Sequence, residues 1–303
     1  MTMRSRLSHA LILLGLGLGF GASAATAAPL RLSPSGHMLT PVMVNGVGPF
    51  NFIVDTCAAG SVIYPQVRER LALAPLSNHQ ANVQGASGHV SASLYRLDRV
   101  EVDGRTRGPL TAVGLDSVGA GTPDLAGVIG VDQVSGFVVE FNLPAGQIRL
   151  VDPATDLTAG AGHPNWAVLP VRFNGPHFPV LDGTIDGRPV TILFDTGARR
   201  TVINWAAARA LGVAPGDANL QPTEPISGAT ADRTPSVKRD FHTIRIAGFD
   251  IAANEITIAD LPVFDRLGIG GRPVMLLGMD RMRASRFAVD YPRSRILVAQ
   301  AAR

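Results

Sequence analysis

The chain has 303 residues, of which 46% are hydrophobic and 17% charged, so it can bury a sizeable core and is not expected to be disordered. Its formal net charge is +3, but the cations are scattered arginines with Lys238 as the only lysine, and a chain without a basic stripe is not expected to bind nucleic acid. A single cysteine excludes an intrachain disulfide and a cysteine-rich metal site, and the isolated histidines indicate no metal, so no cofactor is expected.

Residues 1–28 have the pattern of an export signal. Two arginines near the start precede an apolar stretch without charge, residues 10–20, and small residues allow cleavage after Ala24, Ala27 or Ala28. The alternative is an uncleaved membrane anchor, but a span needs about 20 apolar residues. We therefore expect a cleaved signal and an exported protein, periplasmic or secreted, with no stable membrane insertion after cleavage.

Residues 29–151 are expected to form a first lobe built mainly of short strands. Asn45-Gly46 is a hairpin turn signal between alternating apolar residues. The apolar run that follows ends at Asp55-Thr56. Further along the chain we expect a short helix at 64–73, a glycine-bearing hairpin at 83–88, a second hairpin turn at 100–104, and strands at 127–129, 139–141 and 148–151.

The remainder of the chain repeats this pattern. The segment 152–165 lacks apolar periodicity and is expected to be a linker. In the expected second lobe, residues 166–303, TILFDTGARRTVI (191–203) matches NFIVDTCAAGSVI (51–63) at a constant offset (195 − 55 = 140). A turn at Asp186-Gly187, a helix at 204–211, ISGAT at 226–230, a hairpin at 244–248 and MLLGMDRM at 275–282 also have counterparts. This predicts an all-β fold of two homologous barrel-like lobes with a few short helices.

The two Asp-Thr loops point to chemistry. Asp55 and Asp195 each follow an apolar strand, where an ionised carboxylate is costly unless it is paired or hydrogen-bonded. In a single loop, the aspartate could simply cap its own turn by accepting backbone amides. Turn capping explains less well why both copies keep the Asp-Thr sequence. A two-fold arrangement of the repeats would bring the carboxyl groups together, where they would share one proton. One group could then activate water while the other protonates a carbonyl oxygen.

These loops resemble the active-site loops of the retropepsin-like aspartic peptidases. VIG (128–130) and LLG (276–278) resemble the hydrophobic-hydrophobic-glycine element of that family, and the similarity extends over residues 38–300. The resemblance implies a single-chain, bilobal aspartic endopeptidase with its active site in the cleft between the lobes. It implies that Asp55 and Asp195 form the catalytic dyad, and that a peptide or protein substrate binds as an extended strand.

The resemblance also implies roles for the surrounding residues. The hydroxyls of Thr56 and Thr196 would lock the two loops together, and the loops would be completed by Cys57, Ala58, Gly197 and Ala198. A flap that closes over the substrate would consist of Gln84, Gly85, Ala86, Ser87 and Gly88. Ser227-Gly228 has the corresponding place in the second half, where it forms either a second flap or only a turn.

Cys57 leaves two alternatives open, because it stands where the second loop has Gly197. The first is a catalytically weak or inactive peptide-binding module on the same fold. The second is a cysteine hydrolase, which is disfavoured because neighbouring carboxylates keep a thiol protonated and the only histidine within twenty residues is His37. The cost of a side chain at Cys57 depends on its backbone angle φ.

Overall fold

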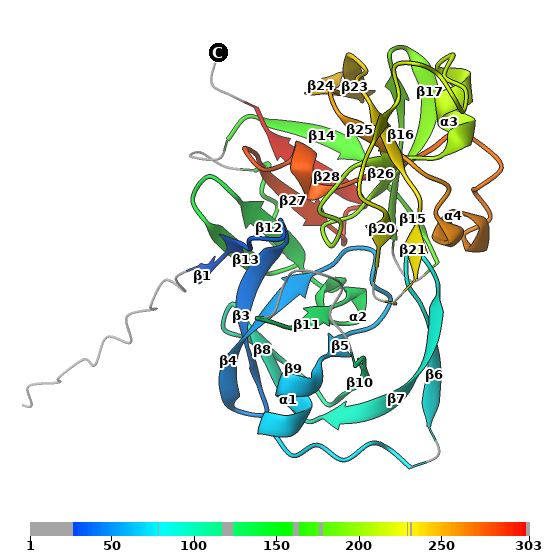
Figure 1. The fold of residues 1–303 in the computed structure, drawn as a ribbon. Coiled ribbons are helices and arrows are strands. Elements are labelled where there is room, and N and C mark those ends of the chain that lie inside the picture. Colours follow the sequence, from blue (N-terminus) through cyan, green and yellow to red (C-terminus); the bar gives the residue numbers. More distant parts are fainter. Residues whose placement is uncertain are drawn as a thin grey trace, which may run out of the picture.

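The computed structural model describes residues 27–77, 79–116, 124–159, 164–175, 178–228, 230 and 232–300. The expected signal segment therefore lies outside the described residues, except for Ala27 and Ala28. Within the described part, the regular structure is almost entirely β, which confirms the predicted fold class (Figure 1). No helix in that part is long and apolar enough to cross a membrane.

The first lobe is built on a ten-stranded sheet in the order β6-β7-β10-β5-β11-β4-β3-β8-β9, with β2 paired to β3. Two helices accompany this sheet, α1 (Pro65–Arg70) and α2 (Val131–Val134). The strands are β2 (Arg31–Leu32), β3 (Met38–Val44), β4 (Val47–Val54), β5 (Val62–Ile63), β6 (Gln80–Gln84), β7 (His89–Leu97), β8 (Val100–Val102), β9 (Arg105–Arg107), β10 (Leu110–Gly114) and β11 (Leu125–Ile129).

The second lobe has a matching ten-stranded sheet in the order β19-β22-β25-β18-β26-β17-β16-β23-β24, with β15 paired to β16. Its strands are β15 (Arg172–Asn174), β16 (Phe178–Ile185), β17 (Arg188–Phe194), β18 (Val202–Ile203), β19 (Gln221–Pro222), β22 (Val237–Arg239), β23 (Thr243–Ile246), β24 (Phe249–Ala252), β25 (Ile256–Ile258) and β26 (Val274–Leu277). A separate hairpin joins β20 (Ile226–Ser227) to β21 (Arg233–Thr234). The helices are α3 (Trp205–Ala210), α4 (Pro262–Arg266) and the 3-10 turn η1 (Met279–Arg281).

The hairpin turns follow from the sequence. Asn45 and Gly46 have φ values of 50° and 78°, and Asp186 and Gly187 have 46° and 79°. Two successive residues with positive φ match the right-handed twist of the flanking strands, and asparagine, aspartate and glycine tolerate this conformation best. The hairpins predicted at both positions are confirmed by the antiparallel pairs β3–β4 and β16–β17.

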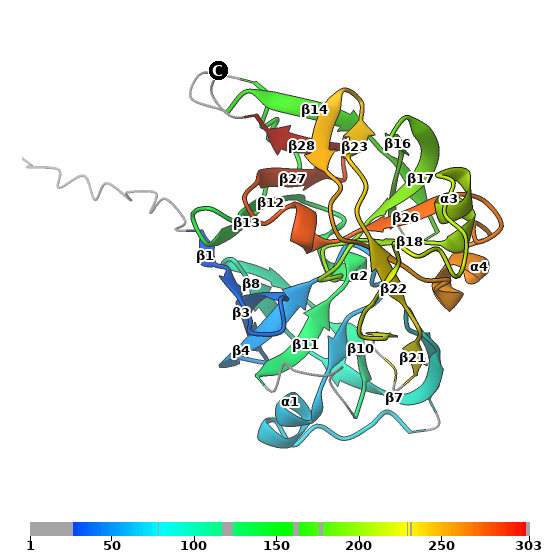
Figure 2. The ribbon, with the colours of Figure 1, turned by 45° about the horizontal axis from the view of Figure 1, so that its top comes forward.

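A third, six-stranded sheet joins the two halves of the chain, in the order β1-β13-β12-β27-β28-β14. At its centre β12 of the first half pairs antiparallel with β27 of the second, and Phe141 stacks on Phe287 at 4.8 Å between ring centroids. Figure 2 shows this sheet spanning both lobes. The strands are β1 (Ala28–Pro29), β12 (Val138–Asn142), β13 (Gln147–Val151), β14 (Trp166–Pro170), β27 (Arg286–Asp290) and β28 (Arg295–Ala299).

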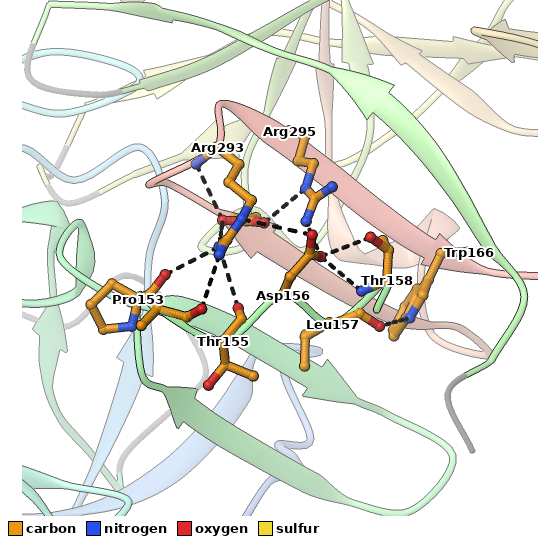
Figure 3. A network of polar contacts seen from close by, with 10 residues as sticks. Pro153, Thr155, Asp156, Leu157, Thr158, Trp166, Arg293 and Arg295 are labelled. Carbon is orange, nitrogen blue, oxygen red and sulfur yellow. Dashed lines mark hydrogen bonds and ion pairs between the residues drawn. The ribbon is translucent and has the colours of Figure 1, made fainter. Parts of the chain in front are cut away.

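The chain that leaves this sheet after β13 is held by two arginines of the second half (Figure 3). Arg293 donates to the carbonyl oxygens of Pro153, Ala154 and Thr155 at 3.1–3.3 Å. Arg295 donates to Asp156 and, at 2.8 Å, to Asp290, whose side chain is fully buried. Residues 153–156 are therefore anchored to the shared sheet, although they lack the apolar periodicity of a strand.

Candidate active site

Asp55 and Asp195 lie at equivalent ends of two buried strands. In the first lobe β11 lies between β4 and β5, parallel to β4, and the Asp55 amide donates to Ile129 at 2.9 Å. In the second lobe β26 occupies the same place beside β17, and the Asp195 amide donates to Leu277 at 3.0 Å. Each aspartate is thus positioned by the end of a strand rather than by a free loop.

Two glycines allow the chain to cross behind each loop. A Cβ atom at Gly130 would lie 2.7 Å from the carbonyl oxygen of Ala58, and one at Gly278 would lie 2.5 Å from that of Arg200. Both distances are too short for a real side chain. Glycine is therefore required in the hydrophobic-hydrophobic-glycine element for a steric reason, since neither residue has a positive φ.

Thr56 and Thr196 connect the two loops through a reciprocal set of hydrogen bonds. Each hydroxyl oxygen accepts the backbone amide of the other threonine, at 3.0 and 3.1 Å. Each hydroxyl donates at 2.7 Å to a carbonyl oxygen of the opposite strand, Thr56 to Phe194 and Thr196 to Val54. Both side chains are buried, so these bonds are shielded from water.

The two carboxyl groups lie close enough for each to shift the pKa of the other, and the second loop lies directly against Asp55, since a Cβ atom at Gly197 would be 2.2 Å from Asp55 Oδ2. Asp55 Oδ1 accepts the amide of Cys57 at 2.7 Å, and Asp195 Oδ1 accepts the amides of Gly197 and Ala198 at 2.8 and 3.1 Å. These amides hold one oxygen of each carboxyl group in place. The contact between the carboxyl groups is stable only when a proton lies between them, since two carboxylates would repel.

The pKa of each carboxyl group is raised above its usual range. For Asp195 burial is the largest cause and the charge of Asp55 the next. For Asp55 burial again raises the pKa, while the amide of Cys57, the Asp195 side chain and the amide of Ala58 oppose it. The pair therefore retains one proton to higher pH than an isolated aspartate, and it titrates as a unit.

The environment of Cys57 does not favour a nucleophilic thiolate. Burial raises the pKa of its thiol well above the usual range, and the charges of Asp195 and Asp55 raise it further. Its Sγ lies 3.6 Å from the carbonyl oxygen of Phe194. The backbone of Cys57 does not have a positive φ, so its side chain causes no strain of that kind.

Gly197, the counterpart of Cys57, has no room for a side chain. A Cβ atom there would lie 2.2 Å from Asp55 Oδ2. The two loops are therefore alike in backbone hydrogen bonding but differ in the space beside the opposite carboxyl group. This difference makes the site asymmetric.

The residues of the expected flap, 84–88, form the tip of the β6–β7 hairpin. Its turn is closed by the Gly85 amide, which donates to Gly88 at 2.8 Å. The buried Ser87 hydroxyl donates at 2.9 Å to the carbonyl oxygen of Ile226 in the β20–β21 hairpin. A Cβ atom at Gly228 would lie 2.9 Å from the amide of Ala86. Both views show the two hairpins meeting across the lobes (Figures 1 and 2).

The segment of Ser227 and Gly228 is thus a hairpin that touches the first flap, rather than a turn alone. Residues 229 and 231 lie outside the described residues. Gln84, the remaining residue of the expected flap, donates through its Nε2 to the carbonyl oxygen of Gly85 at 2.8 Å.

The sequence analysis missed a set of hydrogen bonds that joins each Asp-Thr loop to the glycine element behind it. The Ser61 hydroxyl donates to Asp132 at 2.9 Å, and the Thr201 hydroxyl donates to Asp280 at 2.7 Å. Ser61 and Thr201 also accept the amides of Gly130 and Gly278, at 3.2 and 3.1 Å. The signal was present in the repeat, because each glycine element continues to an aspartate two residues later. Among the described residues no group of three or more side chains could hold a metal ion.

Two lobes that each contribute an Asp-Thr loop to a pair of touching carboxyl groups form the arrangement of an aspartic-type peptidase. A family comparison agrees with this reading. The family model described as aspartyl protease matches residues 40–133 and 181–281, which include both loops, and the chain belongs to this family. The resemblance noted in the sequence is therefore confirmed. No curated protein matches the chain.

Proposed function

We propose that the protein is an aspartic endopeptidase that hydrolyses peptide bonds by activating water at Asp55 and Asp195. The observation that carries this proposal is the contact between two carboxyl groups whose pKa values are both raised by burial. A pair that keeps one proton supplies a base and an acid at once, and amide hydrolysis needs both.

In the proposed reaction the ionised carboxylate takes a proton from a water molecule as its oxygen attacks the peptide carbonyl carbon. The protonated carboxyl group gives its proton to the carbonyl oxygen, which forms a tetrahedral diol. The carboxyl group that took the proton from water then gives it to the nitrogen, while the other carboxylate takes a proton from one hydroxyl of the diol. The carbon–nitrogen bond breaks, which releases an amine and a carboxylic acid and leaves the pair with its single proton again. No covalent intermediate with the protein is needed.

The substrate we propose is a peptide or protein segment bound as an extended strand between the carboxyl pair and the two flap hairpins. The contact from Ser87 to Ile226 supports this placement, because it joins one hairpin from each lobe, just as the carboxyl pair takes one residue from each lobe. We also propose that residues 1–28 direct export to the periplasm or beyond. The mature protein would then comprise lobes 29–151 and 166–303 with the linker 152–165, and it would need no metal or cofactor.

The test is hydrolysis of a diverse peptide pool between acidic and neutral pH, with Asp195→Asn and Asp55→Asn as variants. Loss of a proton-transfer partner in such a unit costs about a thousandfold or more in rate. Asp182→Asn is the matched control, because Asp182 is an exposed aspartate paired with Arg172 in the second lobe. Binding without cleavage by the wild-type protein at every pH would instead support the peptide-binding module.

A further inference from the structure

The second Asp-Thr loop carries two arginines where the first carries none. Arg199-Arg200 follow Ala198, whereas Ala59-Gly60 follow Ala58 at the equivalent positions of the repeat. Arg200 has partners within its own lobe, the Thr223 hydroxyl at 3.2 Å and the Glu224 carboxylate at 3.8 Å. The hydrogen-bond partner of Arg199, in contrast, lies in the other lobe.

Arg199 reaches across to the first lobe. Its Nη1 donates to the carbonyl oxygen of Ser35 at 3.3 Å, in the loop that precedes β3. Beside it, a Cβ atom at Gly36 would lie 3.6 Å from Arg199 Cβ and 3.1 Å from Arg283 Nη2. Two guanidinium groups of the second lobe therefore flank one loop of the first, next to the Asp-Thr loop.

Neither guanidinium forms an ion pair with a residue that the structure describes. Among the ion pairs formed within the described residues, none involves Arg199 or Arg283, whereas nearby Arg281 pairs with Asp280 at 3.3 Å. His37, in the same loop as Ser35, is held neutral at neutral pH, since burial and the charge of Arg199 lower its pKa to about 4. The uncompensated positive charge at this place is thus that of the two arginines.

The guanidinium of Arg199 lies at the boundary between the lobes. It donates to Ser35 of the first lobe, and its charge lowers the pKa of His37 in the same loop. Arg199 belongs to the same loop as Asp195, between β17 and β18, so a peptide bound over the carboxyl pair would run close to Arg199.

We propose that Arg199 and Arg283, with the 33–37 loop, form an anion-binding subsite that selects peptides with a carboxylate on one side of the scissile bond. The carboxylate is either an acidic side chain or the C-terminus of the peptide. This inference rests on the proposed peptidase function and names a substrate class for it. Guanidinium groups suit the role because they stay charged and bind carboxylates through two parallel hydrogen bonds. At the equivalent positions of the first loop, Ala59 and Gly60 carry no charge.

The test separates recognition from cleavage by measuring peptide retention on the Asp195→Asn variant. Randomised short peptides, acetylated and amidated, carry either one glutamate or one glutamine at each position in turn. A third set has no acidic side chain but a free C-terminus, which distinguishes the two sources of the carboxylate. We expect glutamate or the free C-terminus to be favoured roughly tenfold, at positions on one side only, as for a hydrogen-bonded charge.

Arg199→Ala, which restores the residue found in the first loop, should bring the ratio of glutamate to glutamine retention close to one. Arg199→Glu should bring this ratio below one, and a thermal melt of each variant checks that the fold persists. Arg188→Ala is the matched control, because Arg188 is exposed in the Asp186-Gly187 hairpin, and it should leave the ratio unchanged.

Equal retention of glutamate and glutamine peptides by Asp195→Asn would overturn the subsite, whatever the wild-type protein cleaves. Retention biased toward glutamate without any cleavage by the wild-type protein would instead overturn the peptidase proposal and keep the subsite. If no peptide is retained, the same ratios are measured by cleavage with the wild-type protein, and the absence of both retention and cleavage overturns the two proposals together.

Discussion

Thr56 and Thr196 form a closed set of hydrogen bonds across the two lobes, in which each hydroxyl accepts the other's amide and donates to the other's strand. Thr56→Val or Thr196→Val keeps the shape of the side chain but leaves a buried amide and a buried carbonyl without a partner. We expect each variant to lose about 2–4 kcal/mol of stability. Denaturant unfolding measures this loss.

The matched control for this prediction is Thr40→Val. Thr40 is also fully buried, but its hydroxyl makes a single bond, to Pro29 at 3.0 Å. This variant should lose only about 1 kcal/mol. The double variant at Thr56 and Thr196 should lose less than the sum of the two singles, because both belong to one network. If the loss of stability in the double variant equalled the sum of the two single losses, the two threonines would not belong to one network.

Cys57 and Gly197 should respond in opposite ways to substitution. Gly197→Ala places a methyl group against Asp55 Oδ2, where the built Cβ lies 2.2 Å away, so the carboxyl group must move. A displacement of this kind costs about a hundredfold in kcat/KM. Cys57→Gly keeps the amide that donates to Asp55 and should retain peptide hydrolysis. A large loss of kcat/KM in Cys57→Gly would reveal a role of the thiol.

The stability of the protein should depend on pH through the carboxyl pair. Because the pKa of Asp195 is raised in the folded state, its contribution is fully present below the unfolded value of about 3.8 and is lost as pH rises through the folded pKa. Asp195→Asn removes this loss. We expect its melting temperature to match that of the wild type at acidic pH and to exceed it at neutral pH. Each 1 kcal/mol of unfolding free energy that the wild type loses corresponds to a difference of roughly 2–4 °C.

Asp182→Asn provides the control of opposite sign. Its hydrogen bond with Arg172 lowers the pKa of Asp182, so this group stabilises the fold above the unfolded pKa and the effect is lost as pH falls. The variant should be slightly less stable than the wild type at neutral pH and equal to it in acid. If the melting temperatures of Asp195→Asn and Asp182→Asn changed with pH in the same way, relative to the wild type, the raised pKa could not be assigned to Asp195.

Ser87→Ala should weaken the contact between the two flap hairpins. It removes the hydrogen bond to the carbonyl oxygen of Ile226. A lost bond of this kind corresponds to about 1 kcal/mol, or roughly fivefold in kcat/KM, and we expect the change mainly in KM. Ser91→Ala is the control, since the Ser91 hydroxyl bonds Gln80 on the exposed part of the same hairpin. If Ser87→Ala and Ser91→Ala changed KM equally, the hydrogen bond from Ser87 to Ile226 would have no specific role in substrate binding.

The contacts of Ala28 move the proposed end of the signal from residue 28 to residue 27, which makes Ala28 the proposed mature N-terminus. The Ala28 amide donates to Asp103 Oδ1 at 2.8 Å and the residue pairs with Ile148 in the shared sheet, so cleavage after Ala27 would leave a terminal ammonium on a carboxylate. Mass spectrometry of the exported protein identifies the terminus. Asp103→Asn should lower the melting temperature of that protein, and a mature chain that begins after Ala28 would contradict this expectation.

Local signals carried much of the prediction. Asn45-Gly46 and Asp186-Gly187 specify tight hairpins by their own conformational preferences, so they could be placed from the sequence. Helices were predicted at 64–73 and 204–211, and the structure has the shorter helices α1 and α3 within these ranges. The internal repeat singled out the two Asp-Thr loops. A single Asp-Thr loop could be explained as a turn-capping aspartate, whereas two matching copies favour a catalytic pair.

Contacts between distant segments could not be predicted in the same way. The apolar runs of β12 and β27 have the same pattern, and nothing in either shows that Val139 pairs with Val289 of the second half in addition to Leu150 of its own half. Helix α4 was missed because its five residues are too few to show a helical period. The contact between Arg199 and Ser35 depends on how the lobes meet, so it became visible only in the structure.

The central pairing of β12 with β27 has an evolutionary consequence. A symmetric dimer of identical lobes must carry every substitution twice, once in each half of its site. Here one covalent chain supplies both halves and a continuous sheet holds them together, so each loop can change alone. The cysteine at position 57 and the arginine at position 199 are changes of this kind, each present in one copy. Symmetry is kept at Thr56 and Thr196, where the two halves must fit each other.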